Sequence, residues 1–175
     1  MIYDLMSLRR SRRTYSQKPI EKEKIELFKK AALLAPTSKD KQSVEFVFTE
    51  NKVLLKKLSE AKNKGGDFIK DAALAVTIMS DSLIDDVWIE DAAVAGAHLM
   101  LLAEEMGLSC CWSQIRRRFN DDEGNMMAND IVKRILSIPQ KYEVLSILAI
   151  GNRSDIPEEF PTRTINPQRI HIEKF

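Results

Sequence analysis

Four arginines occupy five consecutive positions near the start of the chain, in the segment Arg9-Arg10-Ser11-Arg12-Arg13. Like charges at this density repel one another, so the segment needs a counter-charge. A phosphate monoester supplies one, because it carries about −1.5 to −2 charges and accepts hydrogen bonds from guanidinium and hydroxyl groups. The segment therefore indicates a phosphate site, with a solvated basic turn or a nucleic-acid contact as the alternatives.

Three further regions could present polar groups to a ligand. Residues 35–42, Ala-Pro-Thr-Ser-Lys-Asp-Lys-Gln, stand between a predicted helix and a predicted strand, where short polar side chains and backbone N–H groups are exposed. Glu90-Asp91 opens a long apolar helix that Gly107 to Gln114 follows, and Ile138-Pro139 precedes a strand that ends at Gly151. Alone, each region reads as an ordinary connection, and the helix dipole explains an acidic residue at a helix start.

In this order and spacing, the regions resemble the nitroreductase family of FMN-dependent oxidoreductases over essentially the whole chain. The family's opening Arg-x-Ser-x-Arg/Lys matches residues 9–13, and its Ala-Pro-Ser-Ser-x-Asn-x-Gln loop is similar to residues 35–42. Its Glu-Asp and its Gly-Leu-Gly-Ser-Cys-Trp strand resemble residues 90–91 and 107–112, and its Gly-Ile-Pro, strand and Gly resemble residues 137–151. Five ordered matches are far more specific than any one motif.

The resemblance implies a non-covalently bound FMN. Arg9 and Ser11 would hold its phosphate, with Arg163 from the C-terminal tail completing the clamp and Arg10 assisting. Arg13 would reach flavin N1 and O2, where a cation stabilises the negative charge of the reduced flavin.

The same resemblance assigns a second set of residues to the flavin ring. Those expected to line one isoalloxazine face, donated by the other subunit, are Pro36, Thr37 and Ser38. Gln42 would bond the flavin edge or the ribityl chain, and Ser113 and Gln114 would offer groups toward N5 and O4. Asp40 replaces the family's Asn, and its carboxylate can accept a hydrogen bond from flavin N3–H but cannot donate one to O2.

The implied activity is an FMN-dependent oxidoreductase of the nitroreductase type. NAD(P)H would donate a hydride, and a nitroaromatic, a quinone or a similar small electrophile would accept it in a ping-pong scheme. Because the flavin carries the chemistry, no catalytic side chain and no metal are expected. An FMN-binding or FMN-storage protein without turnover is the alternative.

Hydrophobic periodicity predicts the elements that must position these groups. We expect helices at 2–10, 21–34, 53–61, 86–106 and 129–136, and strands at 44–48, 73–79, 108–115, 143–150 and 170–172. These elements form one α+β domain over residues 1–175. The resemblance implies a nitroreductase-like arrangement, a central and mostly antiparallel sheet flanked by helices.

The long helix also predicts an intertwined homodimer. Residues 92–103 are almost uncharged, and a helix that is apolar nearly all round needs cover on all sides. The N-terminal arm and the tail 152–175 have little core of their own, which favours exchange with a partner subunit, with Trp88 and Phe175 as candidate contacts. His98 on this helix is interpreted as a buried, hydrogen-bonded residue rather than a catalytic base.

Composition excludes several other classes of protein. The net charge of +1 over 175 residues argues against nucleic-acid binding, and no apolar run reaches the length that spans a bilayer. With no signal peptide in view, the adjacent Cys110 and Cys111 are expected to be free thiols in a reducing cytoplasm. The Gly65-Gly66 pair predicts either a plain turn or, in the segment 63–68, a lid over the flavin, with the loop 116–125 as the other candidate for controlling access.

Overall fold

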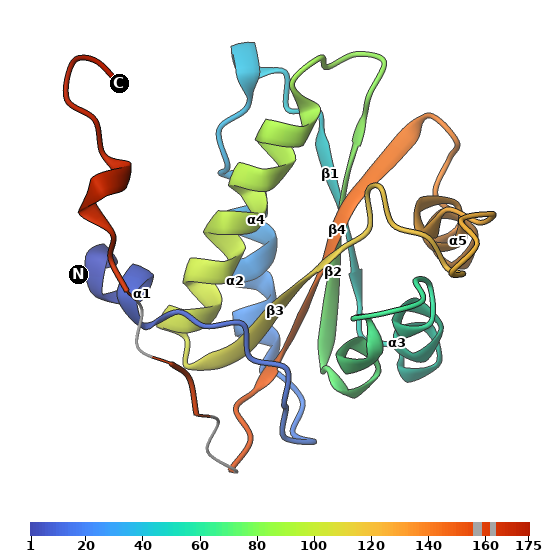
Figure 1. Cartoon of the computed structure of the whole chain (residues 1–175). Helices are drawn as coiled ribbons and strands as arrows, with labels where there is room; N and C mark the ends of the chain where they lie inside the picture. The colour runs from blue at the N-terminus through green and yellow to red at the C-terminus, as the bar shows by residue number, and fades with distance from the viewer. Residues whose placement is uncertain (156–158, 162–163) are drawn as a thin grey trace.

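One four-stranded antiparallel sheet forms the centre of the computed structural model, which describes residues 1–155, 159–161 and 164–175 (Figure 1). The strands are β1 (Val44–Thr49), β2 (Leu74–Asp81), β3 (Leu108–Gln114) and β4 (Tyr142–Asn152), in the order β1-β2-β4-β3. The two central strands are buried along almost their whole length, which explains their continuous apolar sequences. Because β3 is an edge strand, its outer side is open to other parts of the chain.

Helices cover both faces of this sheet, which confirms the α+β arrangement. They are α1 (Ile2–Leu8), α2 (Lys22–Leu33), α3 (Lys52–Ser59), α4 (Trp88–Glu105) and α5 (Ala128–Leu136). Figure 1 shows α2 and α4 on one face and α3 and α5 on the other. Two hydrophobic cores result, one around Phe28 and Leu99 and the other around Leu55 and Ile147. Each helix and strand expected between residues 2 and 150 is confirmed.

Two glycines permit close contacts that the fold requires. A Cβ atom on Gly96 of α4 would lie 2.4 Å from Cζ3 of Trp112, so the helix can approach β3 only because this position has no side chain. A Cβ atom on Gly151 would lie 2.8 Å from Cδ1 of Tyr15, whose hydroxyl donates a hydrogen bond to the carbonyl of Ala149 at 3.3 Å. Gly151 therefore leaves the room that Tyr15, just after the arginine segment, needs to pack against β4.

The strand expected at residues 170–172 is wrong for the single chain. A short 3₁₀ turn, η3 (Pro167–Arg169), precedes a segment without regular structure, and Ile172 is 84% exposed. Figure 1 shows this tail standing apart from the body of the molecule. A strand needs a hydrogen-bonded neighbour, and within the described residues the tail has none.

The cover expected around α4 is also incomplete within one chain. Ala92, Ala95 and Leu99 are buried, whereas residues 93–94 and 97–98 are exposed. His98 is thus not buried, which corrects its interpretation as a core residue.

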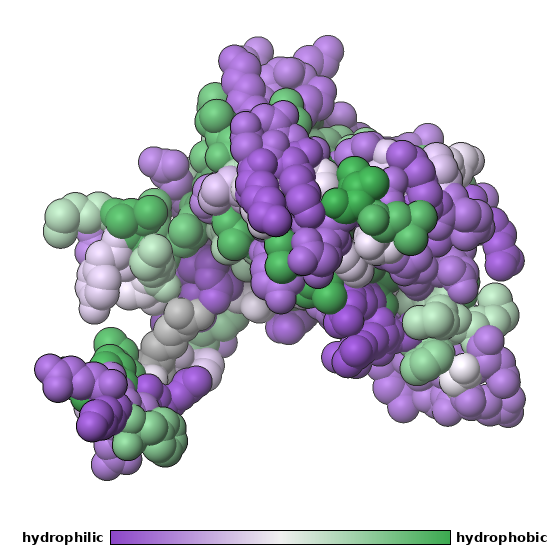
Figure 2. Space-filling view, turned by 90° about the horizontal axis from the view of Figure 1, so that it is seen from above, coloured by the Kyte–Doolittle hydropathy of each residue, from purple (hydrophilic) through white to green (hydrophobic). Residues whose placement is uncertain are grey.

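Seen from above, the surface shows hydrophobic residues among hydrophilic ones (Figure 2). Of the helices in the described ranges, none is long and apolar enough to cross a membrane.

Candidate functional site

The arginine segment runs along the open edge of β3. The backbone N–H of Arg12 donates a hydrogen bond to the carbonyl of Cys110 at 3.1 Å, which docks the segment onto the edge strand. Ser11 and Arg13 approach the thiol of Cys111 by hydrogen bonding. Burial raises the pKa of the Cys111 thiol, although the nearby cations Arg13 and Lys62 oppose this effect. Both cysteines are free thiols, as expected from their adjacent positions.

The positive charge of this segment is only partly compensated. Glu104, near the end of α4, lies 3.8 Å from Arg12 and is shared with Arg153 at 2.8 Å. The guanidinium of Arg10 donates to the carbonyls of Ser7 and Arg9, at 2.6 and 3.0 Å, so it shapes the backbone. Within the described residues, the half-buried guanidinium of Arg9 has no ion pair or hydrogen bond. Arg9 is therefore a cation of this segment that an anion could bind.

Residues 62–68 bring a further cation and an aromatic ring to the same place. Lys62 is half-buried, and its ammonium donates a hydrogen bond to the carbonyl of Gln114 at 3.2 Å. Burial lowers the pKa of Lys62, and the positive charge of Arg118 lowers it further. The guanidinium of Arg13 lies 5.8 Å from the centre of the Phe68 ring. Sequence reasoning missed Lys62, because nothing in the sequence separates it from the other surface lysines.

The last residues of β3 differ in accessibility. The Ser113 hydroxyl is buried, and no partner for its oxygen is found among the described residues. Gln114 is half-buried, with its side-chain oxygen accepting a hydrogen bond from Trp112 Nε1 at 2.9 Å and its amide donating to the carbonyl of Arg116 at 3.2 Å. The tail residue expected to complete the phosphate clamp, Arg163, lies outside the described residues.

The loop 36–42 is held in a strained conformation beside the start of α4. Three of its residues other than glycine adopt a positive φ: Lys39 and Asp40, both at 54° in the 3₁₀ turn η1 (Ser38–Asp40), and Gln42 at 48° just after it. The hydroxyl of Thr37 accepts a hydrogen bond from the backbone N–H of Gln42 at 2.9 Å. The amide of Gln42 donates to the Asp40 carboxylate at 3.2 Å. Strain of this kind persists only where the surroundings enforce it, and it is typical of binding sites.

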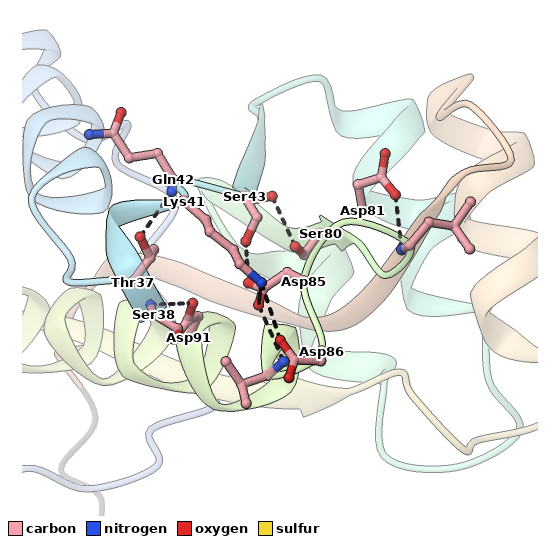
Figure 3. Close-up of polar contacts among 12 residues, drawn as sticks. Thr37, Ser38, Lys41, Gln42, Ser43, Ser80, Asp81, Asp85, Asp86 and Asp91 are labelled. Carbon is pink, nitrogen blue, oxygen red and sulfur yellow. Dashed lines mark hydrogen bonds and ion pairs between the residues drawn. The ribbon is translucent and has the colours of Figure 1, made fainter.

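Two aspartates enforce this conformation (Figure 3). Asp91 in the first turn of α4 accepts a hydrogen bond from the backbone N–H of Ser38 at 2.8 Å, so the helix dipole is not its only role. Asp85 accepts a hydrogen bond from the Ser43 hydroxyl and pairs with Lys41 at 3.4 Å. Burial by itself would raise the pKa of Asp85, but the hydrogen bonds from Ser43, from the Val87 N–H and from Lys41 outweigh it and lower the pKa. Asp85 is therefore a charged anchor of the loop.

Within one chain, the loop and the arginine segment lie near opposite ends of α4. Ser38 bonds to Asp91, and Arg12 pairs with Glu104, thirteen residues further along the helix. At 1.5 Å per residue these two anchors are about 20 Å apart. The structure thus brings Arg9, Ser11 and Arg13 together beside Cys110 and Cys111 of β3. It anchors the loop with Thr37 and Ser38 near the other end of α4.

Comparisons with known proteins agree on one family. Residues 6–82 and 62–152 match the model of the nitroreductase family. A relative from Archaeoglobus fulgidus with the provisional name NADH dehydrogenase/NAD(P)H nitroreductase is 31% identical over 172 residues, which are 95% of this chain and 94% of the relative. The structure of an FMN-dependent nitroreductase from Clostridium difficile R20291 superposes with a TM-score of 0.91 at 38% identity, covering 98% of both chains. A nitroreductase family protein from Clostridium difficile 630 gives a TM-score of 0.79 at 26% identity, over 100% of this chain and 99% of that one.

Proposed function

The chain belongs to the nitroreductase family, and from that premise we propose that it is an FMN-dependent NAD(P)H oxidoreductase acting on a small electrophile. The observation that carries this proposal is the arginine segment on the edge of β3, in which the guanidinium of Arg9 has no ion pair or hydrogen bond among the described residues. A relative named for NAD(P)H and a similar structure named for FMN support the two ligands. We expect the whole chain, 1–175, to act as one FMN-binding domain.

The residues present fit the phosphate of FMN. The guanidinium of Arg9 has no hydrogen bond or ion pair in the described part of the chain, and Ser11 is exposed nearby, so both can bond to a phosphate monoester. Arg10 is occupied by backbone carbonyls and would orient the segment rather than bind strongly. Arg163 is assigned to this clamp by the family resemblance.

Cations and polar groups at the other end of β3 fit the flavin ring. Arg13 and Lys62 would stabilise negative charge at the pyrimidine edge, and the partial burial of Lys62 strengthens its effect because water screens it less. Gln114 would offer its amide, whereas Ser113 would act through its backbone, since its hydroxyl is buried. When bound, FMN supplies hydride transfer at N5, and no side chain is needed as acid or base.

The second half of the site would come from a partner subunit. The loop bearing Pro36, Thr37 and Ser38 and the arginine segment are anchored about 20 Å apart along α4, and the family resemblance requires this loop to reach the flavin of the other subunit. A homodimer in which each loop reaches the other chain's arginine segment meets this requirement. Gln42 and Asp40 would then lie at the flavin edge, where the Asp40 carboxylate would disfavour the reduced, anionic flavin.

The tail 152–175 is proposed to contribute to the same dimer. Its residues Ile165, Ile170 and Phe175 are more than 70% exposed. The free edge of β1 borders cavities of about 340 and 310 Å³, lined by Leu33, Val44 and Phe46 among others. A partner's tail could fill these cavities and gain the strand neighbour that residues 170–172 lack in the single chain.

Reduction of the purified protein by each nucleotide tests the proposal. A yellow protein whose flavin absorbance bleaches anaerobically with NADPH or NADH, and returns when a nitroaromatic or a quinone is added, supports a ping-pong oxidoreductase. FMN that stays oxidised with both nucleotides would instead indicate a storage or carrier protein. A protein that binds no FMN would contradict both functions.

A further inference from the structure

Three consecutive arginines follow the end of β3. Arg116, Arg117 and Arg118, which we call the arginine rim, form no ion pair with any carboxylate in the described ranges. The acids of the same loop are engaged elsewhere. Asp121 accepts hydrogen bonds from the backbone N–H groups of residues 125 and 126, and Asp122 accepts from Asn63 and pairs with Lys64.

Hydrogen bonds fix the backbone of the arginine rim. The N–H of Arg116 donates to the carbonyl of Leu145, the N–H of Arg118 donates to that of Ile115, and the carbonyl of Arg118 accepts from Ala128 at 2.9 Å. Arg117 adopts a φ of 57°, a left-handed conformation that costs energy for a residue other than glycine. Such strain persists only where the surrounding packing offsets it, and residues strained in this way are typical of functional positions.

The rim borders the proposed flavin site without being part of its phosphate clamp. Lys62, whose ammonium bonds to the carbonyl of Gln114, is close enough to Arg118 to feel its charge. The guanidinium of Arg116 lies 6.0 Å from the ring centre of Trp88. The strand β3 continues in extended form from Cys111, where Ser11 docks, to Gln114, and a turn that contains Arg116 and Arg117 follows it. The rim is therefore a second cationic group, on the far side of Lys62 from the arginine segment.

We propose that the arginine rim binds the 2′-phosphate of NADPH and makes NADPH the preferred hydride donor. This inference rests on the proposed function. The 2′-phosphate is a monoester with close to two negative charges at neutral pH, and guanidinium groups bind such an anion through paired hydrogen bonds. NADH lacks this group, whereas the pyrophosphate is common to both nucleotides. Nitro compounds and quinones need no negative charge, so the acceptor does not account for an uncompensated arginine rim.

The test compares both donors on the FMN-loaded protein. Arg116→Gln, Arg117→Asn and Arg118→Gln are made singly and together, with Asn chosen because it tolerates positive φ better than most residues. Arg134→Gln on α5 is the matched control, since Arg134 is exposed and forms no ion pair among the described residues. We expect a lower KM for NADPH than for NADH in the unaltered protein. The triple variant should raise the NADPH KM by about 10-fold or more and leave the NADH KM within about twofold.

A binding measurement gives a readout that does not depend on turnover. By calorimetry, adenosine 2′,5′-bisphosphate should bind more tightly than adenosine 5′-monophosphate, and the triple variant should remove the difference. Equal KM values for the two donors in the unaltered protein would overturn the inference. So would a triple variant that raises both KM values equally, or an Arg134→Gln variant with the same effect. Failure of FMN to be reduced by either donor would instead overturn the proposed function, while the calorimetric comparison would still decide the role of the rim.

Discussion

Replacing Arg9 by alanine should weaken FMN binding and leave riboflavin binding unchanged. The Arg9 guanidinium is half-buried and has no competing partner among the described residues, so the phosphate would gain its full hydrogen bond. A hydrogen bond to a charged group contributes about 1.5–3 kcal/mol, which corresponds to about a 10- to 150-fold loss in affinity. Riboflavin lacks the phosphate, so its affinity isolates every other consequence of the substitution. Fluorescence titration of the apoprotein measures both dissociation constants.

Two comparisons test whether Arg9 itself binds the phosphate. Arg10→Ala should cost less than Arg9→Ala, because the Arg10 guanidinium already bonds to the carbonyls of Ser7 and Arg9. Equal affinity of the unaltered protein for FMN and riboflavin would refute the phosphate assignment. Arg9→Ala lowering both affinities by the same factor would show that Arg9 maintains the fold of the segment rather than binding the phosphate.

Three further outcomes are expected. Light scattering should give twice the 20.0 kDa chain mass, and a monomeric unaltered protein would contradict the shared site. The variant Ala97→Arg, on the exposed face of α4, should be a monomer with reduced affinity for FMN. Gly96→Ala should destabilise the protein by about 1–3 kcal/mol in urea unfolding, because its Cβ would meet Trp112; an unchanged midpoint would show that the indole can move. Affinity for reduced FMN should fall as pH rises through the lowered pKa of Lys62 toward its ordinary value of 10.5, because the negative charge at the pyrimidine edge of the reduced flavin favours protonated Lys62. Lys62→Met should flatten this part of the profile, and an unchanged profile would remove Lys62 from the site.

Local signals in the sequence predicted most of the fold. The buried strands β2 and β4 appear as continuous apolar runs, and α5 follows from its strongly amphipathic pattern. The arginine segment was identifiable because its charge density is unusual at any position. Gly151 was noted only as the end of a strand, and its contact with Tyr15 explains why a glycine stands there.

Features that depend on residues far apart in the sequence, or on a second chain, could not be predicted in this way. Lys62 becomes part of the site only because α3 and β3 converge, which leaves no trace in the local sequence. Residues 170–172 have the apolar pattern of a strand, but a strand forms only beside another strand. The exposure of His98 has the same origin, since an apolar pattern indicates that a helix face is covered and not which chain covers it.

The geometry of α4 indicates how two incomplete sites would be completed in the proposed dimer. Asp91 anchors the strained loop near one end of the helix, and Glu104 holds the arginine segment near the other. The midpoint between these anchors falls at residues 97–98, on the face that is exposed in the single chain. A twofold axis through that point would set the helix antiparallel to its copy, so that each loop meets the partner's arginine segment. Ala93 and Ala97 are small enough for close approach there, and a dimer built in this way closes the gap of about 20 Å without any change in the fold of either chain.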